Sequence, residues 1–234
     1  MRTARGGGRM RRLATLAGAL GLAVALALGC AGARPPADGA LVRAASGGDA
    51  LRVYDALEEL IAAGRDTPAD REYAYERVRQ HEEDTAAYTF ARAAVTGRLV
   101  QVLGLRGAAL VRDVEHYARR SRELDPDFRD GAATRLLGTL YVIAPARLLA
   151  HGDSEEGLAM LEDLAHRRPD VIENHLRLAE AYVALGDPGP AAPHLCACLS
   201  DKDALRRDDR ELLSELLGRG STLPCSAAAA LAPR

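Results

Sequence analysis

The sequence predicts an all-α protein, a stack of antiparallel helical hairpins with about nine helices after an N-terminal leader. The first observation is composition: Ala, Leu and Arg are abundant, Trp is absent and β-branched residues are sparse after the leader, which favours helix over sheet. The second is apolar periodicity at helical spacing from Asp49 onward. The third is internal repetition in the second half, at the period of about 34 residues that helical-hairpin repeats use.

Residues 1–29 have the pattern of an export signal. A basic flank precedes the uncharged apolar run Leu13–Leu28, and Gly29 then supplies a small residue at a cleavage point. The run is shorter than the ~20 residues that a bilayer-spanning helix needs. Its ending resembles a bacterial lipobox, in which Cys30 would be lipidated and become the mature N-terminus. An uncleaved anchor helix and an ordinary signal with a chance cysteine are the alternatives.

The mature chain is expected to be a moderately acidic protein tethered by lipid. The leader carries none of the 33 acidic residues, so its removal leaves an acidic chain without a basic stripe for nucleic acid. No second apolar stretch is long enough to cross a membrane, which predicts a soluble body. Ala31 after Cys30, rather than Asp, agrees with sorting to the periplasmic face of the outer membrane in Gram-negative bacteria.

Three segments are expected after the leader. Residues 30–48 are rich in small residues, Pro and Gly, and are typical of a flexible tether. Residues 49–220 carry the helical periodicity and form the predicted domain. Residues 221–234 are expected to be disordered or stapled to that domain.

Start and stop signals place the helices of the first half. They predict helices from Asp49 to about Ala63, from near Pro68, from Asp84 to about Leu103 before Gly104, and from about Arg106 to Leu124 before Asp125-Pro126.

Two parts of the second half can be aligned, residues 136–169 and residues 178–198. They share a small residue in the first helix, a tyrosine three positions later, a Gly-Asp turn, and then an apolar second helix. This pattern resembles the tetratricopeptide repeat, in which small residues lie where paired helices touch. The residues that define it here are Gly138, Tyr141, Gly152, Asp153, Pro169, Tyr182, Gly186 and Asp187.

Seven extra residues, Pro145 to His151, interrupt the first of these repeats. Pro145 should end the preceding helix at about Ile143 and could begin a short turn of its own. Insertions in a repeat usually form a loop on one face, often the binding face. Pro145, Arg147 and His151 are therefore the candidate binding residues.

Aromatic and basic side chains are the other candidates for ligand contacts. Tyrosines at helical spacing are expected to be core side chains: Tyr73, Tyr75, Tyr88, Tyr141 and Tyr182. Three arginines could line a concave surface for an anion, although solvated charges are the favoured interpretation: Arg135, Arg147 and Arg177.

The insert and the lipobox together indicate one particular family among the proteins with tetratricopeptide-like repeats. Residues 131–187 resemble the T-component family of TRAP transporters, often called TatT. This resemblance implies a periplasm-facing lipoprotein that is all-helical, often trimeric, and has a channel or cavity through its helical body. It also implies a soluble periplasmic solute-binding protein as partner. The alternative is a tetratricopeptide lipoprotein that acts as a scaffold or pilotin in outer-membrane assembly.

No catalytic or metal-binding constellation is found in the sequence. The six histidines are scattered, and no pair has the spacing of a zinc-binding helix motif. No nucleophile elbow, P-loop or dinucleotide fingerprint occurs in the mature chain. We therefore expect a protein that is not an enzyme and that needs neither cofactor nor metal.

Three cysteines follow Cys30. Cys196 and Cys198 lie two apart on a predicted helix and cannot readily pair with each other. Either could bridge to Cys225, and Cys196 is favoured because Cys198 falls at a core position of the repeat. Three free thiols are the alternative.

Overall fold

The computed structural model describes residues 37–218 and Cys225. All regular structure in this part of the chain is helical, with no strand, which confirms the predicted all-α class. The predicted leader, the predicted lipid-attachment residue Cys30 and the tail apart from Cys225 lie outside the described residues.

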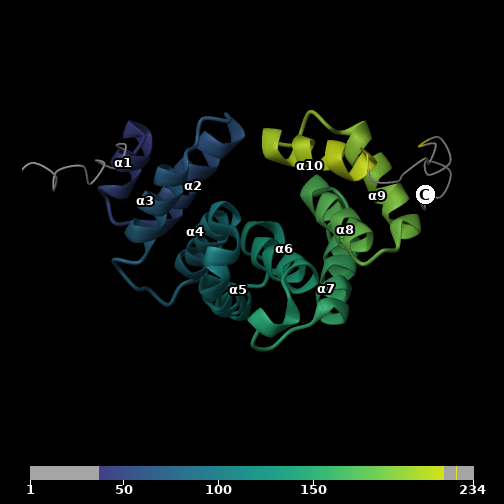
Figure 1. The fold of residues 1–234 in the computed structure, drawn as a ribbon, viewed down its shortest axis with the longest axis horizontal. Helices are drawn as coiled ribbons and strands as arrows, with labels where there is room; N and C mark the ends of the chain where they lie inside the picture. Colours follow the sequence, from purple (N-terminus) through teal and green to yellow (C-terminus); the bar gives the residue numbers. More distant parts are fainter. Residues whose placement is uncertain (1–36, 219–224, 226–234) are drawn as a thin grey trace, which may run out of the picture. The chain divides into compact units, whose positions relative to one another are not determined.

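A short helix, α1, is followed in this region by nine longer α-helices and two short 3-10 helices (Figure 1). Their bounds are α1 Gly39–Ala45, α2 Ala50–Ala62, α3 Pro68–Val78, α4 Ala86–Leu103, η1 Gly104–Leu110, α5 Val111–Leu124, α6 Phe128–Ile143, η2 Ala146–Leu148, α7 Ser154–Arg167, α8 Ile172–Ala184, α9 Pro188–Ser200 and α10 Arg207–Gly218.

Polar side chains cap the starts of five helices, α1, α2, α3, α4 and α7. The Asp49 carboxylate accepts a hydrogen bond from the backbone N–H of Leu51 at 2.8 Å, the predicted cap of α2. Thr67 and Asp70 form a reciprocal capping box before α3. The prediction that a helix opens at Asp84 was wrong by two residues, because the Thr85 hydroxyl caps α4 instead.

The predicted flexible tether over residues 30–48 was wrong for its C-terminal part. Residues Gly39–Ala45 form α1, and the Leu41 side chain is 0% exposed within the core of α2, α3 and α4. The backbone N–H of Asp38 also donates to the Asp70 carboxylate at 2.7 Å. A buried leucine, a long-range hydrogen bond and the Asp38 cap hold this segment to the domain, although its composition is that of a linker.

The predicted helix from Arg106 to Leu124 begins later than expected. Gly104 ends α4 with a φ of 54°, as a residue without a side chain can do at low cost. A 3-10 segment then runs to Leu110 before α5 starts at Val111. Leu105 in that segment is 89% exposed, so it lacks the burial that would hold it in a regular helix.

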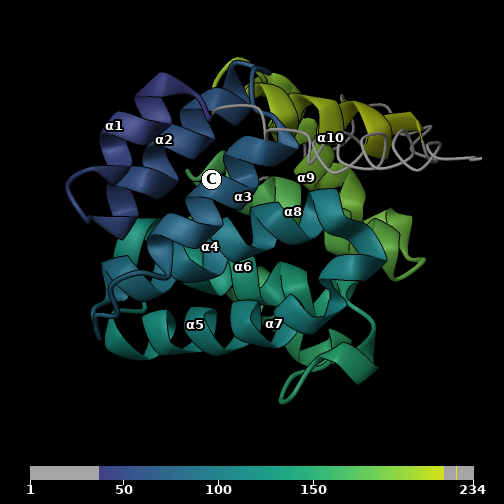
Figure 2. The same ribbon diagram turned by 60° about the vertical axis from the view of Figure 1, so that its left-hand side comes forward.

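Pairs of consecutive helices pack together as hairpins: α4 with α5, α6 with α7, and α8 with α9. In Figure 2 the first helices α4, α6 and α8 form one row, and α5 and α7 run beneath them. Figure 1 shows the pairs following one another, with α10 turned back toward α2. Arg206, just before α10, pairs with Glu58 of α2 at 2.5 Å, and this contact joins the two ends of the described unit.

One helical run, Ala86–Leu124, is long and apolar enough by composition to cross a membrane, so the prediction that no such stretch follows the leader was wrong. It covers α4, η1 and α5 and includes Arg92 and Arg98. Its α4 part supplies core residues such as Phe90 and Val95. Core helices of soluble proteins pass the same test, so this feature alone does not indicate a membrane span.

Candidate functional site

The insert that interrupts the first repeat forms a short ordered loop. Helix α6 ends at Ile143, as predicted from Pro145, and the 3-10 helix η2 follows. Leu149 is buried against Tyr141 and Met160, which holds the far end of the loop to the hairpin. Pro145, Arg147 and His151 are exposed on its surface.

Glu115 of α5 fixes the backbone of this loop. Its carboxylate is 1% exposed and accepts hydrogen bonds from the N–H groups of Ala150 at 2.6 Å, His151 at 2.9 Å and Gly152 at 3.3 Å. Burial raises the pKa of Glu115, but these backbone donors and the Tyr141 hydroxyl outweigh it, and the pKa lies below its usual value. The loop is therefore anchored to a buried charge.

Glu115 was not among the residues predicted from the sequence. Val111, Val114 and Ala118 mark the buried face of α5, and Glu115 falls on the same face. A charged residue at a core position is seldom buried without partners. A glutamate among the apolar positions of this helix was the sign, in the sequence, of a buried carboxylate. It does not show which backbone groups that carboxylate contacts.

Small residues allow the two helices of the first repeat to approach closely. A Cβ atom built on Gly157 would lie 2.7 Å from the carbonyl oxygen of Gly138. One built on Gly152 would lie 2.0 Å from the ring of Tyr141, which is itself buried. Asp153 then caps α7, accepting from the N–H groups of Glu155 and Glu156. Gly138, Tyr141, Gly152 and Asp153 thus occupy the structural positions expected for them.

The second repeat has the same helical pairing with different polar partners. Gly186 takes a φ of 82° at the turn, but the Asp187 side chain makes no capping hydrogen bond. Tyr182 is partly buried and donates to the Glu162 carboxylate at 2.5 Å. Pro169 closes the preceding helix, and its carbonyl oxygen lies 2.9 Å from a ring nitrogen of His175.

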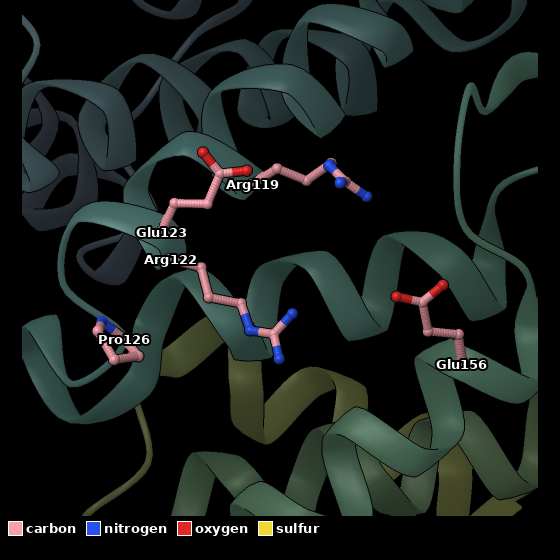
Figure 3. Close-up of a pocket in the computed structure, with 5 residues that line it drawn as sticks. All are labelled: Arg119, Arg122, Glu123, Pro126 and Glu156. Atoms are coloured by element: carbon pink, nitrogen blue, oxygen red, sulfur yellow. The ribbon is translucent and has the colours of Figure 1, made fainter.

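A pocket of about 370 Å³ opens beside the anchored loop, between α5 and α7. Its lining residues are Arg119, Arg122, Glu123, Pro126 and Glu156. Figure 3 shows Arg119 and Arg122 extending from the same helix, with the Glu156 carboxylate facing them. The insert residues Pro145, Arg147 and His151 are not part of this lining, so the pocket and the exposed loop are separate features.

Arg119 links the pocket to the loop. Its guanidinium donates to the Tyr141 hydroxyl oxygen at 3.4 Å, and Tyr141 in turn bonds to Glu115. This hydrogen bond raises the pKa of Arg119.

The three arginines considered for an anion surface lie in different settings. Arg177 of α8 is neutralised by Glu180 at 2.9 Å and Asp209 at 2.5 Å. Arg135 of α6 donates to the buried Asn174 side chain at 2.8 Å, and burial lowers its pKa. Arg147 is exposed on the insert.

The structure joins Cys196 to Cys225 in a disulfide, with 5.2 Å between the Cα atoms. Cys198 is a buried free thiol, and burial raises its pKa to about 12. Over the described residues, no group of three His, Cys, Asp or Glu side chains could hold a metal ion.

The fold and this site define a stack of helical hairpins in which one repeat carries an anchored loop beside a polar pocket. No protein-family model matches the chain, and no curated protein matches it significantly.

Proposed function

We propose that this protein is an envelope lipoprotein that binds a partner protein through the insert of its first clear repeat. The partner is a soluble periplasmic solute-binding protein, and the chain acts as the T-component of a TRAP-type uptake system. The observation that carries the proposal is the insert itself, an exposed loop whose backbone is held by a buried carboxylate.

An anchored loop suits protein recognition. Ordering a mobile segment on binding costs free energy, and a loop already fixed by three hydrogen bonds avoids most of that cost. Stacked helical hairpins also offer extended surfaces that commonly bind proteins. The predicted export signal and the lipobox-like sequence at Cys30 support an envelope location.

The surface of the insert has the mixed character of an interface. Ile143 is 50% exposed at the end of α6, and Pro145 and Arg147 are exposed next to it. Arginine is enriched in protein interfaces, whereas Lys and Glu are depleted, and the buried centre of an interface is more apolar than its rim. A partner would bury this apolar edge and find a guanidinium beside it.

The test is site-specific photo-crosslinking in living cells. A photo-reactive amino acid is placed at Arg147 in the full-length chain, and at the exposed Arg112 of α5 as a matched control. We expect position 147, and not position 112, to capture a periplasmic solute-binding protein identified by mass spectrometry. Capture of an outer-membrane assembly component at position 147 would replace the proposal with the scaffold alternative, and no specific product would refute binding by this loop.

The subunit count gives a second test of the family resemblance. Native mass spectrometry of the detergent-solubilised lipoprotein should show a trimer. A monomer at all concentrations would remove the T-component assignment and leave only the interaction role of the loop.

A further inference from the structure

Two histidines face each other across the hairpin of the second repeat. His175 lies on α8 and His194 on α9, and both side chains are partly buried. Their Nδ1 atoms are 2.9 Å apart, whereas the ring centres are 5.2 Å apart. The two Nδ1 atoms therefore point toward each other, at the distance of a direct hydrogen bond.

The hydrogen positions in this pair follow from a further contact of His175. Its other ring nitrogen, Nε2, lies 2.9 Å from the carbonyl oxygen of Pro169. A carbonyl oxygen only accepts, so Nε2 of His175 carries a hydrogen, and in the neutral ring its Nδ1 has the lone pair. His194 must then donate from its own Nδ1. A single hydrogen thus lies between the two rings.

This arrangement accommodates one added proton but not two. A first added proton can occupy Nε2 of His194, which leaves the shared hydrogen in place and makes the bond between the rings charge-assisted. A second would put a hydrogen on both facing Nδ1 atoms and a positive charge on both rings. Two donors cannot hydrogen-bond to each other, and like charges repel.

The surroundings do little to offset a second charge. Glu162 of α7 acts on His194, but its carboxylate already accepts from the Tyr182 hydroxyl at 2.5 Å. Burial and the neighbouring His175 lower the pKa of His194 to about 4. The positions one helical turn from either histidine are uncharged: Val171, Ile172, Leu178, Ala179, Pro190, Ala191, Ala197 and Cys198.

Charged side chains on the other elements that pack against α8 have partners of their own. Within the described part of the chain, no carboxylate forms an ion pair with either histidine. The partnered groups are Arg168 with Asp127 and Asp130, Arg177 with Glu180 and Asp209, and Arg135 with Asn174. The bond between the two rings is therefore the polar contact on which their protonation acts.

We propose that His175 and His194 form an acid-sensitive latch between α8 and α9. The latch holds the two helices together while the rings share one hydrogen, and it opens when both rings are protonated. Opening frees α9, which carries the Cys196 end of the disulfide to Cys225. The latch does not depend on the partner protein or on the lipid anchor proposed above, because neither contributes a residue to it.

The pH dependence of the latch has a definite sign. In the open hairpin a histidine takes up its proton near the ordinary pKa of about 6.5, whereas in the closed pair the pKa of His194 is about 4. The open form thus binds more protons in this range, so acid favours it. The stabilisation is complete above about pH 6.5 and is lost progressively as pH falls toward 4.

The first test is nuclear magnetic resonance of the full chain, labelled with ¹⁵N-histidine and purified in detergent. At neutral pH we expect a scalar coupling across the hydrogen bond between the Nδ1 nuclei of the two rings. H175N and H194N assign the two sets of signals. Titration should show the second protonation of the pair near pH 4. Absence of the coupling, or two independent titrations near pH 6.5, would overturn the proposal.

The second test is hydrogen exchange in α9 between pH 6.5 and 4.5, corrected for the intrinsic exchange rate. In the wild type the equilibrium constant for opening should rise roughly tenfold per pH unit. In H194N the asparagine amide can donate in place of Nδ1 and does not titrate, so most of this rise should disappear. H166N, at an exposed histidine of α7 outside the pair, should keep it. An undiminished rise in H194N would assign the acid sensitivity to carboxylates instead and refute the latch.

Discussion

Glu115 connects two parts of the chain that the sequence keeps 35 residues apart. Its carboxylate takes the place of water for three loop N–H groups, and in return those groups stabilise a charge that is 1% exposed. Buried carboxylates with several backbone donors remain ionised at neutral pH. The loop and the charge therefore depend on each other.

Replacing this charge with a neutral isostere should loosen the insert. In E115Q the amide oxygen accepts hydrogen bonds more weakly than a carboxylate oxygen does. The NH₂ group of the glutamine would also face loop N–H groups, and two donors cannot hydrogen-bond to each other. We expect a loss of about 1–3 kcal/mol in the free energy of unfolding, measured by urea denaturation. E123Q, on the exposed part of the same helix, should change it by less than about 0.5 kcal/mol. Equal effects of the two variants would contradict the anchoring role.

The same group predicts a pH dependence with a definite sign. The pKa of Glu115 is lower in the folded protein than the ordinary value of about 4.3, so its stabilisation is complete above that value and is lost as pH falls through the folded pKa. Hydrogen-exchange protection at residues 150–152 should therefore fall at acidic pH in the wild type. In E115Q, protection there should be low and nearly independent of pH over the same range.

At the scale of the elements, the distance between the two helices of the first repeat depends on the size of the residues at their contact. Gly138 and Gly157 face each other so closely that a side chain on either meets backbone. G157A should destabilise the protein by about 1–3 kcal/mol in thermal or urea unfolding, because the new methyl overpacks the α6–α7 contact. G189A in α9, where the nearest atom would be 3.7 Å away, should be neutral or stabilising. A neutral G157A would mean that the helices separate at no cost.

Local sequence signals predicted the elements well where the signal is steric. Pro145 ends α6 and Gly104 ends α4, because ring geometry and the missing Cβ act on neighbouring backbone alone. Helix α1 was missed because its order comes from Leu41 and Asp38, whose partners lie in other helices. The pocket was missed for the same reason: Arg119 and Glu156 belong to different hairpins, and nothing in their local sequence relates them.

At the scale of the whole described unit, a buried network of charges joins α10 to the first hairpins. Glu58 of α2 is 5% exposed and is bound by Arg98 at 2.7 Å and by Arg206 at 2.5 Å. Asp208 then bonds to Arg98 at 3.0 Å. The sequence predicted helices around Glu58 and Arg98 but could not show that α10 returns to α2, since that depends on how all the intervening hairpins pack.

Removing the central carboxylate of this network should have a large effect. E58Q leaves the charges of Arg98 and Arg206 without their buried partner, and we expect a loss of about 3 kcal/mol in the free energy of unfolding. E59Q, at the exposed neighbouring position, should lose less than about 0.5 kcal/mol. Chemical denaturation followed by circular dichroism measures both, and a small effect of E58Q would show that α10 is held by apolar contacts instead.

The contact between α10 and α2 affects how the protein unfolds. Linear arrays of hairpins fray from their terminal repeats, because each unit touches only its neighbours. Within the described residues, α10 is held against α2, so this last helix is not free to unfold independently of the first hairpins. We expect all the described helices to unfold in a single cooperative transition. The slowest amide hydrogens in α4 and in α8 should then exchange through the same global unfolding reaction.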